Sequence, residues 1–386
     1  MTERVCIVGG GVIGSLYAAH LASVADVWVL TRREDHARSL EEEGLRVSGK
    51  HDFTARLRAT SDPGELPEVD LAILATKATQ LEQVAAVLAG RLPGATVMTV
   101  QNGLGAEEIV ARYGDWPIVS AVTFMSGDRH ADTHVEYELD TATWLGPYAG
   151  TGTQLERVLE IEQLLRAAGL EAEAFPDLLP AQWSKLIFNA TVNTVSALTC
   201  LGHVELFARE EEPTDLGHLV HALMGEGVRV ATAAGVELHE DPWEMNVLAV
   251  RRGETQQSDY AHVPSMLEDV REARPTEVDF ITGALVREAE RLDVEVPLHT
   301  AMYRLVKGRE AAYPPGEGRA PAVAGEAKTV ERSSACEERR DGACCSRSCW
   351  RSGSRSRPAA ATMTTTATRR RTRRRPGTAR RPASRS

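Results

Sequence analysis

Long apolar runs and metal-binding patterns are both missing from this chain of 386 residues. No apolar stretch approaches the ~20 residues that span a bilayer, so we expect no membrane partner. The six cysteines complete no zinc pattern, because four of them crowd toward the C-terminus without a histidine or a second spaced pair: Cys336, Cys344, Cys345 and Cys349. The sequence therefore predicts neither a membrane protein nor a metal site.

Basic residues are also scarce, except near the C-terminus. The chain carries 44 Lys and Arg against 55 Asp and Glu, but residues 1–313 alone have a net charge of −23 and residues 314–386 one of +12. An acidic body argues against nucleic acid as a partner, because phosphate backbones are bound through positive charge. Met1-Thr2-Glu3-Arg4 leads directly into an apolar run, so we expect no signal peptide and a cytoplasmic location.

Residues 314–386 differ in kind from the rest of the chain. They contain Arg369-Arg370-Arg371, many Ser, Thr, Ala and Pro residues, and almost no large apolar side chains. Such a segment cannot bury enough surface to offset its ordering entropy, so we expect a disordered, Arg-rich tail. A nucleic-acid-binding arm and a metal knuckle are alternatives. The abrupt change of composition near Tyr313 favours a shift of reading frame, and we assign the tail no function.

A glycine-rich loop near the N-terminus is the first indication of a ligand. The apolar run from Val5 leads into Gly9-Gly10-Gly11-Val12-Ile13-Gly14, and a helical pattern follows. This context favours a dinucleotide-binding loop over a glycine turn without a ligand. Gly9 would form the tight turn, Gly11 would admit the pyrophosphate, and Gly14 would allow close helix–strand packing. We therefore predict that residues 9–14 bind a cofactor at a helix N-terminus.

The end of the second predicted strand, over residues 26–30, indicates which dinucleotide is bound. A carboxylate at this position would bind the ribose hydroxyls of NAD, whereas this chain has Thr31-Arg32-Arg33. Guanidinium groups bind a 2′-phosphate through charge-assisted hydrogen bonds, so Thr31 and Arg32 are predicted to select NADP(H). The alternative is a solvated basic turn whose partners are Glu34 and Asp35.

The pattern continues as a Rossmann-type, doubly wound α/β domain. Residues 71–75 and 96–100 are short apolar strands joined by a helical segment over residues 81–92. Polar residues follow each strand, and ligands of open α/β sheets bind at the carboxyl ends of strands, so Lys77 and Asn102 are predicted to face the cofactor. Residues 118–148 have the pattern of further strands that complete the sheet.

From about Pro176 the pattern becomes helical. We predict an all-helical C-terminal domain over residues 176–313, which follows a cofactor domain over residues 1–175. The expected helices cover residues 183–199, 218–234, 241–252, 265–272, 276–292 and 298–308.

Three polar residues interrupt the first of these helices. Lys185, Asn189 and Asn193 are four residues apart and share one helix face. Burying an ammonium and two amides costs several kcal/mol unless polar groups meet them, so this face is predicted to line a site. A salt-bridged lysine and helix–helix amide pairing are the structural alternatives.

From Arg4 to Arg309 the chain resembles the ketopantoate reductase (2-dehydropantoate 2-reductase) family. The dinucleotide loop is common to many families, and the ordered set of later motifs is more specific. These motifs are Thr76-Lys77, Gln101-Asn102-Gly103-Leu104-Gly105, Trp183-Ser184-Lys185-Leu186 with Asn189 and Asn193, Pro264-Ser265-Met266-Leu267-Glu268-Asp269, and Pro275-Thr276-Glu277-Val278-Asp279. The resemblance implies reduction of 2-dehydropantoate, a small keto acid, to (R)-pantoate with NADPH, on the route to pantothenate and coenzyme A.

The resemblance also implies a role for each site residue. Lys185 is implied to be the general acid, and Glu277 to orient it and to bind the substrate hydroxyl. Ser265 is implied to contact the substrate carboxylate. Lys77 and Asn102 are implied to hold the cofactor ribose and the substrate. Asn189 and Asn193 can bind the substrate carboxylate or hydroxyl from successive turns of their helix. As alternatives, Glu277 could be an ordinary first-turn acid of its helix and Ser265 a helix cap.

One position departs from the family pattern, because His262 stands where an Asn is usual, with Pro264 intervening before Ser265. Two other functions stay open. One is reduction of another branched 2-keto acid or an opine-type imine, and the other is a non-catalytic NADP(H) sensor. The retained proton donor argues against the sensor. The sequence does not determine the oligomeric state, and a homodimer is compatible with it.

Overall fold

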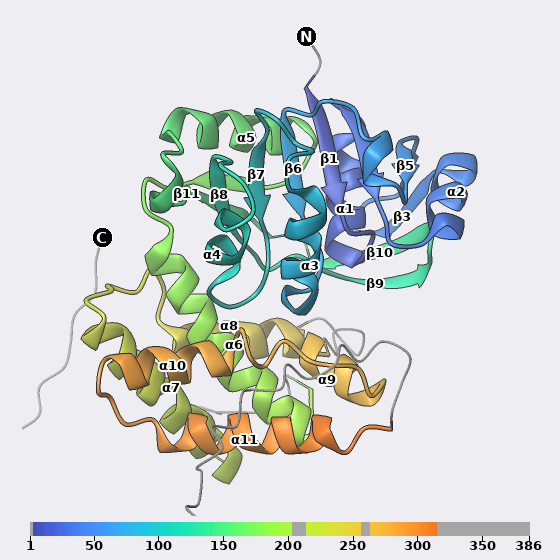
Figure 1. Ribbon diagram of the computed structural model, residues 1–386. Helices are drawn as coiled ribbons and strands as arrows, with labels where there is room; N and C mark the ends of the chain where they lie inside the picture. The colour runs from blue at the N-terminus through green and yellow to red at the C-terminus, as the bar shows by residue number, and fades with distance from the viewer. Residues whose placement is uncertain (1–2, 140, 203–213, 256–262, 315–386) are drawn as a thin grey trace, which may run out of the picture. The chain divides into compact units, whose positions relative to one another are not determined.

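The computed structural model describes residues 3–139, 141–202, 214–255 and 263–314, with the backbone alone for residues 249–255. The described residues belong to one compact unit, in which an α/β region precedes a helical region (Figure 1). This arrangement confirms the predicted fold class. The Arg-rich tail beyond Pro314 and His262 lie outside the described residues, so the predictions made for them stay untested.

An eight-stranded sheet forms the centre of the α/β region, and its strand order is β12-β11-β8-β7-β6-β1-β2-β5. Its strands pair in parallel except for β11, which runs antiparallel to β8. The bounds are β1 Arg4–Val8, β2 Asp26–Leu30, β5 Arg58–Thr60, β6 Leu71–Leu74, β7 Thr96–Thr99, β8 Ile118–Thr123, β11 Thr143–Pro147 and β12 Ala172–Ala174.

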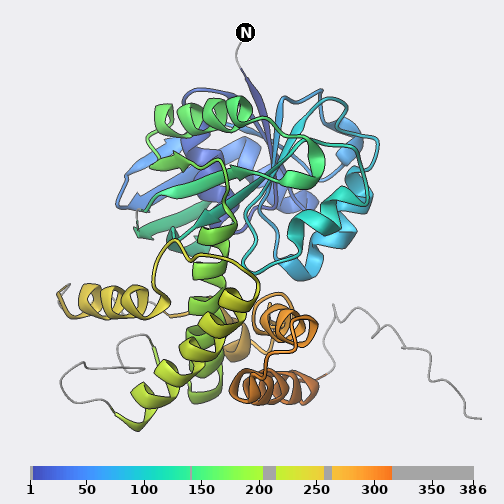
Figure 2. The same cartoon turned by 90° about the vertical axis from the view of Figure 1, so that its left-hand side faces the viewer.

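Helices cover both faces of this sheet (Figure 2). Alternate residues of a strand point to opposite faces, so Val5 and Ile7 of β1 pack in the core beneath α1, whereas Cys6 and Val8 pack in the core beneath α3. Burial on both faces explains why the central strands are almost wholly apolar. The helices of this region are α1 Val12–Leu21, α2 Glu34–Glu43, α3 Ala78–Leu88, α4 Ala106–Ala111 and α5 Leu155–Ala167, with 3₁₀ turns at Pro63–Glu65 and Ala149–Thr151.

A second sheet corrects the prediction for residues 118–148. Strands β8 and β11 do extend the main sheet, but β9 (Ser126–Ala131) and β10 (His134–Leu139) join β3 (Leu45–Gly49) and β4 (Phe53–Ala55) in a separate sheet of order β4-β3-β10-β9. The residues of β9 are polar and mostly exposed. Such a strand suits an edge open to water and not the buried interior of the main sheet.

The helical region is arranged around α6 (Leu179–Thr199), which packs against every other helix of this region. Because neighbours surround α6, most of its residues are buried whatever their position on the helix wheel. The other helices are α7 Asp215–Ala233, α8 Pro242–Thr255, α9 Ser265–Arg271, α10 Thr282–Arg291 and α11 Pro297–Ala311. Among the described helices, none combines the length and apolar character needed to cross a membrane.

The helix predicted over residues 276–292 begins later than expected, at Thr282. Residues 276–281 form turns, and the carbonyl of Phe280 accepts a hydrogen bond from the Leu104 amide at 3.1 Å. A side chain at Gly103 would collide with the same carbonyl, so this loop needs glycine there. A tertiary contact to the loop after β7 thus replaces the first turn of the helix.

Candidate active site

The glycine loop connects β1 to α1 with the geometry that a dinucleotide needs. Gly9 has a φ of 110°, and a Cβ there would lie 2.9 Å from Cγ2 of Thr76. A Cβ at Gly14 would collide with the Gly9 carbonyl, whereas one at Gly11 would meet nothing within 4 Å. No side chain caps the N-terminus of α1, so its amide groups are available to a phosphate. The same turn carries the other predicted cofactor residues, Gly10, Val12 and Ile13.

The basic turn after β2 leaves one guanidinium group open. The Thr31 side chain is buried, and its hydroxyl donates to the Arg33 carbonyl at 2.8 Å, so it shapes the turn. Arg33 pairs with Asp132 and, at 3.3 Å, with Asp35. Arg32 is exposed and forms no hydrogen bond or ion pair with the part of the chain that the structure describes. The alternative of a basic turn paired with its own acidic neighbours therefore describes Arg33, through Asp35, and not Arg32.

The amine of Lys185 is buried at the carboxyl end of β8. The residue is 9% exposed, its Nζ donates to the carbonyl of Thr123, and it lies 5.0 Å from the ring centroid of Phe124. Burial lowers the pKa of Lys185 to about 8, and the negative charge of Glu277 counteracts part of that decrease. Among the described residues no carboxylate forms a salt bridge with Lys185, so none of them makes it the salt-bridged helix lysine of the structural alternative.

The two asparagines of the same helix face are also buried. The Asn189 amide donates to the side-chain oxygen of Asn102 at 3.4 Å, so the amide from α6 meets the loop after β7 and not a neighbouring helix. Asn193, one turn further, forms no hydrogen bond with any described side chain. Helix–helix amide pairing therefore explains neither residue. The structure thus joins Asn189 to Asn102, one turn along α6 from Lys185.

Glu277 caps a different helix from the one expected. It lies in the turn before α10, and its Oε1 accepts a hydrogen bond at 2.7 Å from the amide of Ala78, the first residue of α3. Burial raises the pKa of Glu277, while the Ala78 amide, the Lys77 ammonium and the Asn102 side chain lower it. The prediction that Glu277 opens its own helix is wrong, because the carboxylate stabilises the N-terminus of α3 instead.

Lys77 is held by a residue that the sequence analysis left without a role. Its amine forms an ion pair with Asp269, which is 2% exposed and also accepts from Arg274 at 3.1 Å. Asp269 ends the Ser-Met-Leu-Glu-Asp motif, and its place among the apolar residues Met266, Leu267 and Val270 was the signal. Ser265 opens α9, is exposed, and does not cap it, because the N-cap is Pro264 without a side-chain bond.

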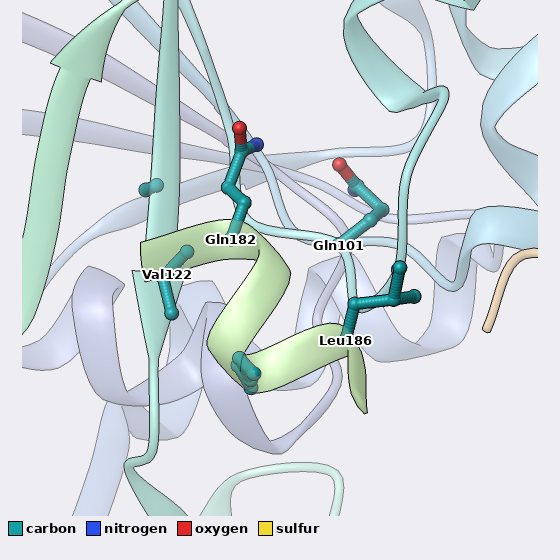
Figure 3. A pocket seen from close by; sticks show the side chains of 7 residues that line it. Gln101, Val122, Gln182 and Leu186 are labelled. Carbon is teal, nitrogen blue, oxygen red and sulfur yellow. The ribbon is translucent and has the colours of Figure 1, made fainter. Parts of the chain in front are cut away.

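A small pocket beside Lys185 brings in glutamines that the sequence analysis did not single out. Figure 3 shows Gln182 and Leu186 extending from α6, with Gln101 from the loop after β7 and Val122 from β8. The Gln101 amide donates to the carbonyls of Leu74 and Thr76 at 2.7 and 3.0 Å, while its Oε1 is buried and has no partner among the residues that the structure describes. The full lining is Gln101, Gly103, Ala121, Val122, Gln182, Lys185 and Leu186.

The glycine loop and these contacts together define the class of protein to which the chain belongs. A parallel sheet presents a dinucleotide loop, and a helical region supplies a buried amine and amides at the carboxyl ends of β6, β7 and β8. Ligands of such sheets bind at this edge. The protein is a Rossmann-type dinucleotide-binding protein whose site is completed by helices.

The chain belongs to the ketopantoate reductase family. The model "Ketopantoate reductase PanE/ApbA" matches residues 5–150, and its C-terminal counterpart matches residues 177–310. A 2-dehydropantoate 2-reductase of Streptococcus pyogenes serotype M1 is 30% identical over 311 residues, covering 80% of this chain and 98% of the relative. One from Archaeoglobus fulgidus is 29% identical over 310 residues, with the same coverage.

Solved structures share the fold. A 2-dehydropantoate 2-reductase from Geobacter metallireducens aligns with a TM-score of 0.70 and 27% identity over 79% of this chain and 99% of that one. A D-mandelate dehydrogenase solved with NADH and anilino(oxo)acetate aligns with a TM-score of 0.71 over 81% and 99% of the two chains. At 23% identity, the second similarity is one of fold alone.

Proposed function

We propose that this protein reduces 2-dehydropantoate to (R)-pantoate with NADPH, a step toward pantothenate and coenzyme A. The observation that carries the proposal is the buried amine of Lys185, whose pKa is lowered to about 8, one turn along α6 from Asn189, which donates to Asn102. Membership in the ketopantoate reductase family and relatives named 2-dehydropantoate 2-reductase support the choice of substrate. We take residues 1–175 as the cofactor domain and residues 176–313 as the substrate domain.

The glycine loop fits the cofactor, since Gly11 faces open space and the first amides of α1 have no cap. When bound, NADPH supplies the hydride that reduces the keto carbon. Residues 9–14 hold its pyrophosphate, and Arg32 binds the 2′-phosphate with Thr31 supporting the turn. Lys77 and Asn102 hold the cofactor ribose and the substrate. A small keto acid completes the site.

Lys185 acts as the general acid. Reduction of the keto carbon leaves negative charge on its oxygen, and a nearby cation that donates a proton stabilises that charge. A pKa of about 8 keeps the amine mostly protonated at neutral pH and makes it a better acid than an exposed lysine. The carbonyl of Thr123 accepts one of three N–H bonds, which leaves the others for the substrate.

Glu277 and the polar residues around it orient the lysine and the substrate. The Ala78 amide fixes the Glu277 carboxylate, and its negative charge favours the protonated form of Lys185. Glu277 binds the substrate hydroxyl. The substrate carboxylate and hydroxyl are bound by Asn189, Asn193 and Ser265. This role gives a hydrogen-bond partner to the Asn193 amide, which has none among the described residues, and to the exposed hydroxyl of Ser265.

A test measures NADPH oxidation by absorbance with 2-dehydropantoate, other branched 2-keto acids and opine-type imines. We expect the highest kcat/KM with 2-dehydropantoate, and a fall in kcat of ~10²–10⁴-fold for Lys185→Ala with unchanged NADPH affinity. Lys50→Ala, at an exposed position after β3, is the control and should retain full activity. A higher kcat/KM with another keto acid or imine would assign that compound as the substrate in place of 2-dehydropantoate. Tight NADPH binding without oxidation by any compound would favour the sensor.

A further inference from the structure

Strand β9 forms a further wall beside the elements that bind the dinucleotide. At its N-terminal end, a Cβ added to Gly127 would lie 3.3 Å from Cγ1 of Val12, in the glycine loop. At its other end, the turn into β10 places Asp132 against Arg33, in the basic turn after β2. One polar strand therefore extends from the phosphate-binding loop to the ribose-selecting turn, and Figure 1 shows β9 and β10 side by side along this edge.

Two arginines from separate elements converge on the Asp132 carboxylate. Nη2 of Arg33 pairs with Oδ2, and Nη1 of Arg129, on β9, lies 3.7 Å from Oδ1. The three side chains are between 32% and 47% exposed, so the cluster is open to solvent. Exposed ion pairs of this kind contribute little to stability. The arrangement is that of an anion site whose occupant is a carboxylate of the chain itself.

His36 fixes this cluster to the glycine loop. Its Nε2 lies 3.0 Å from the backbone carbonyl of Asp132, and its Cε1 would lie 2.6 Å from a Cβ added to Gly10. Burial lowers the pKa of His36, so the ring is neutral at pH 7 and donates through Nε2 to that carbonyl. The backbone of the turn is therefore held by a contact that does not involve the Asp132 carboxylate, so this carboxylate can rotate away from the arginines without breaking the His36 contact.

We propose that the Asp132 carboxylate occupies the 2′-phosphate subsite of the ligand-free enzyme, and that Arg129 and Arg33 bind the phosphate once Asp132 withdraws. A phosphate dianion carries more charge and more acceptor oxygens than a carboxylate, so it displaces Asp132 from both guanidinium groups. NADH has no group that competes. Arg129 is thus a second cationic partner beyond the basic turn, and Asp132 sets the NADPH to NADH ratio. The inference rests on the NADPH preference in the proposed function.

The test uses 2′,5′-ADP and 5′-AMP, which differ only in the 2′-phosphate, and measures their Kd by calorimetry. For Arg129→Ala we expect affinity for 2′,5′-ADP to fall about tenfold while that for 5′-AMP stays within twofold, because one charge-assisted bond is lost. For Asp132→Asn we expect tighter binding of 2′,5′-ADP, by a few-fold, and no change for 5′-AMP. Arg112→Ala, which removes an exposed Arg112–Glu82 pair on other helices, is the matched control and should change neither Kd.

Several results would overturn the inference. If Arg129→Ala weakens both nucleotides equally, or neither, Arg129 has no contact specific to the 2′-phosphate. If Asp132→Asn weakens 2′,5′-ADP, its carboxylate supports the subsite and does not block it. A wild-type enzyme that binds both probes equally would refute the subsite and the NADPH preference together. Keto-acid turnover with NADH would still be measurable in that case, so the proposed reductase activity is tested separately.

Discussion

Replacing Glu277 by glutamine tests the coupling between this carboxylate and Lys185. The change keeps the size of the side chain and an oxygen that can accept from the Ala78 amide, but removes the negative charge that raises the pKa of Lys185. A nearby opposite charge shifts the pKa of an ionisable group by ~1–3. Taking the lower end, we expect the pKa of Lys185 to fall from about 8 to ~7.

The magnitude follows from the fraction of protonated lysine. At pH 8 the wild-type amine is about half protonated, and that of Glu277→Gln is about one-tenth protonated, whereas at pH 6 both are more than ~90% protonated. The ratio of wild-type to variant kcat should therefore grow about fivefold between pH 6 and pH 8. Because kcat is measured at saturating substrate, weaker substrate binding through Glu277 does not enter this comparison.

The assay is a pH profile of kcat at saturating NADPH and keto acid. Glu226→Gln is a matched control, because Glu226 is another buried glutamate of the helical region, bound to His299 and the amides at the start of α11. Its profile should follow the wild type. If the ratio of wild-type to Glu277→Gln kcat stays constant from pH 6 to pH 8, the coupling between Glu277 and Lys185 is refuted. If Glu277→Gln and Glu226→Gln show the same change of this ratio, the change reflects lost stability and not the charge of Glu277.

Three further predictions concern stability and cofactor choice. Lys185→Met should raise the free energy of unfolding by up to about 3 kcal/mol at pH 7, since burial disfavours the charged amine. The folded pKa of Lys185, about 8, lies below its unfolded pKa, so the stability of the wild type rises with pH between these two values. The gain in stability of the variant, measured by thermal melts, should therefore vanish near pH ~10.5. Gly103→Ala should lower Tm by several degrees, because residue 103 has a φ of 97° and the added Cβ would collide with the Phe280 carbonyl. Gly90→Ala is the control that measures the cost of a positive φ alone, because Gly90 has a φ of 71° and no atom lies within 4 Å of the added Cβ. Arg32→Asp should shift the ratio of kcat/KM for NADPH and NADH by at least tenfold toward NADH, at no cost in Tm because Arg32 has no described partner; an unchanged ratio would count against NADPH selection by this turn.

Much of the fold was predictable because its signals are local. The strand before Gly9, the glycine spacing and the helix after it are adjacent in sequence, and the structure confirms each of them. Helical periodicity likewise located most of the C-terminal helices, and α6 begins four residues before its predicted start. Errors fell where a distant contact decides the local structure. Residues 276–281 form turns because the Phe280 carbonyl bonds the loop at Leu104, and β9 and β10 leave the main sheet to pair with β3.

The candidate site shows the same division. The sequence alone placed Lys185, Asn189 and Asn193 on one helix face, because their spacing matches the helical repeat. It could not reveal which groups surround that face, since the Thr123 carbonyl, the Asn102 amide and the Glu277 carboxylate lie far away in the chain.

Sequence by itself determined the glycine loop between its strand and helix, the helical face with its amine, and the family, because each depends on residue types at short, regular spacing. Only the tertiary structure decided that Glu277 caps α3, that Asp269 holds Lys77, and that Asp132 meets Arg33 and Arg129. The physical reason is that charge, burial and hydrogen bonding act through space. A lysine acquires a pKa near 8 from the groups that enclose it, and those groups come from strands and loops distant in the chain.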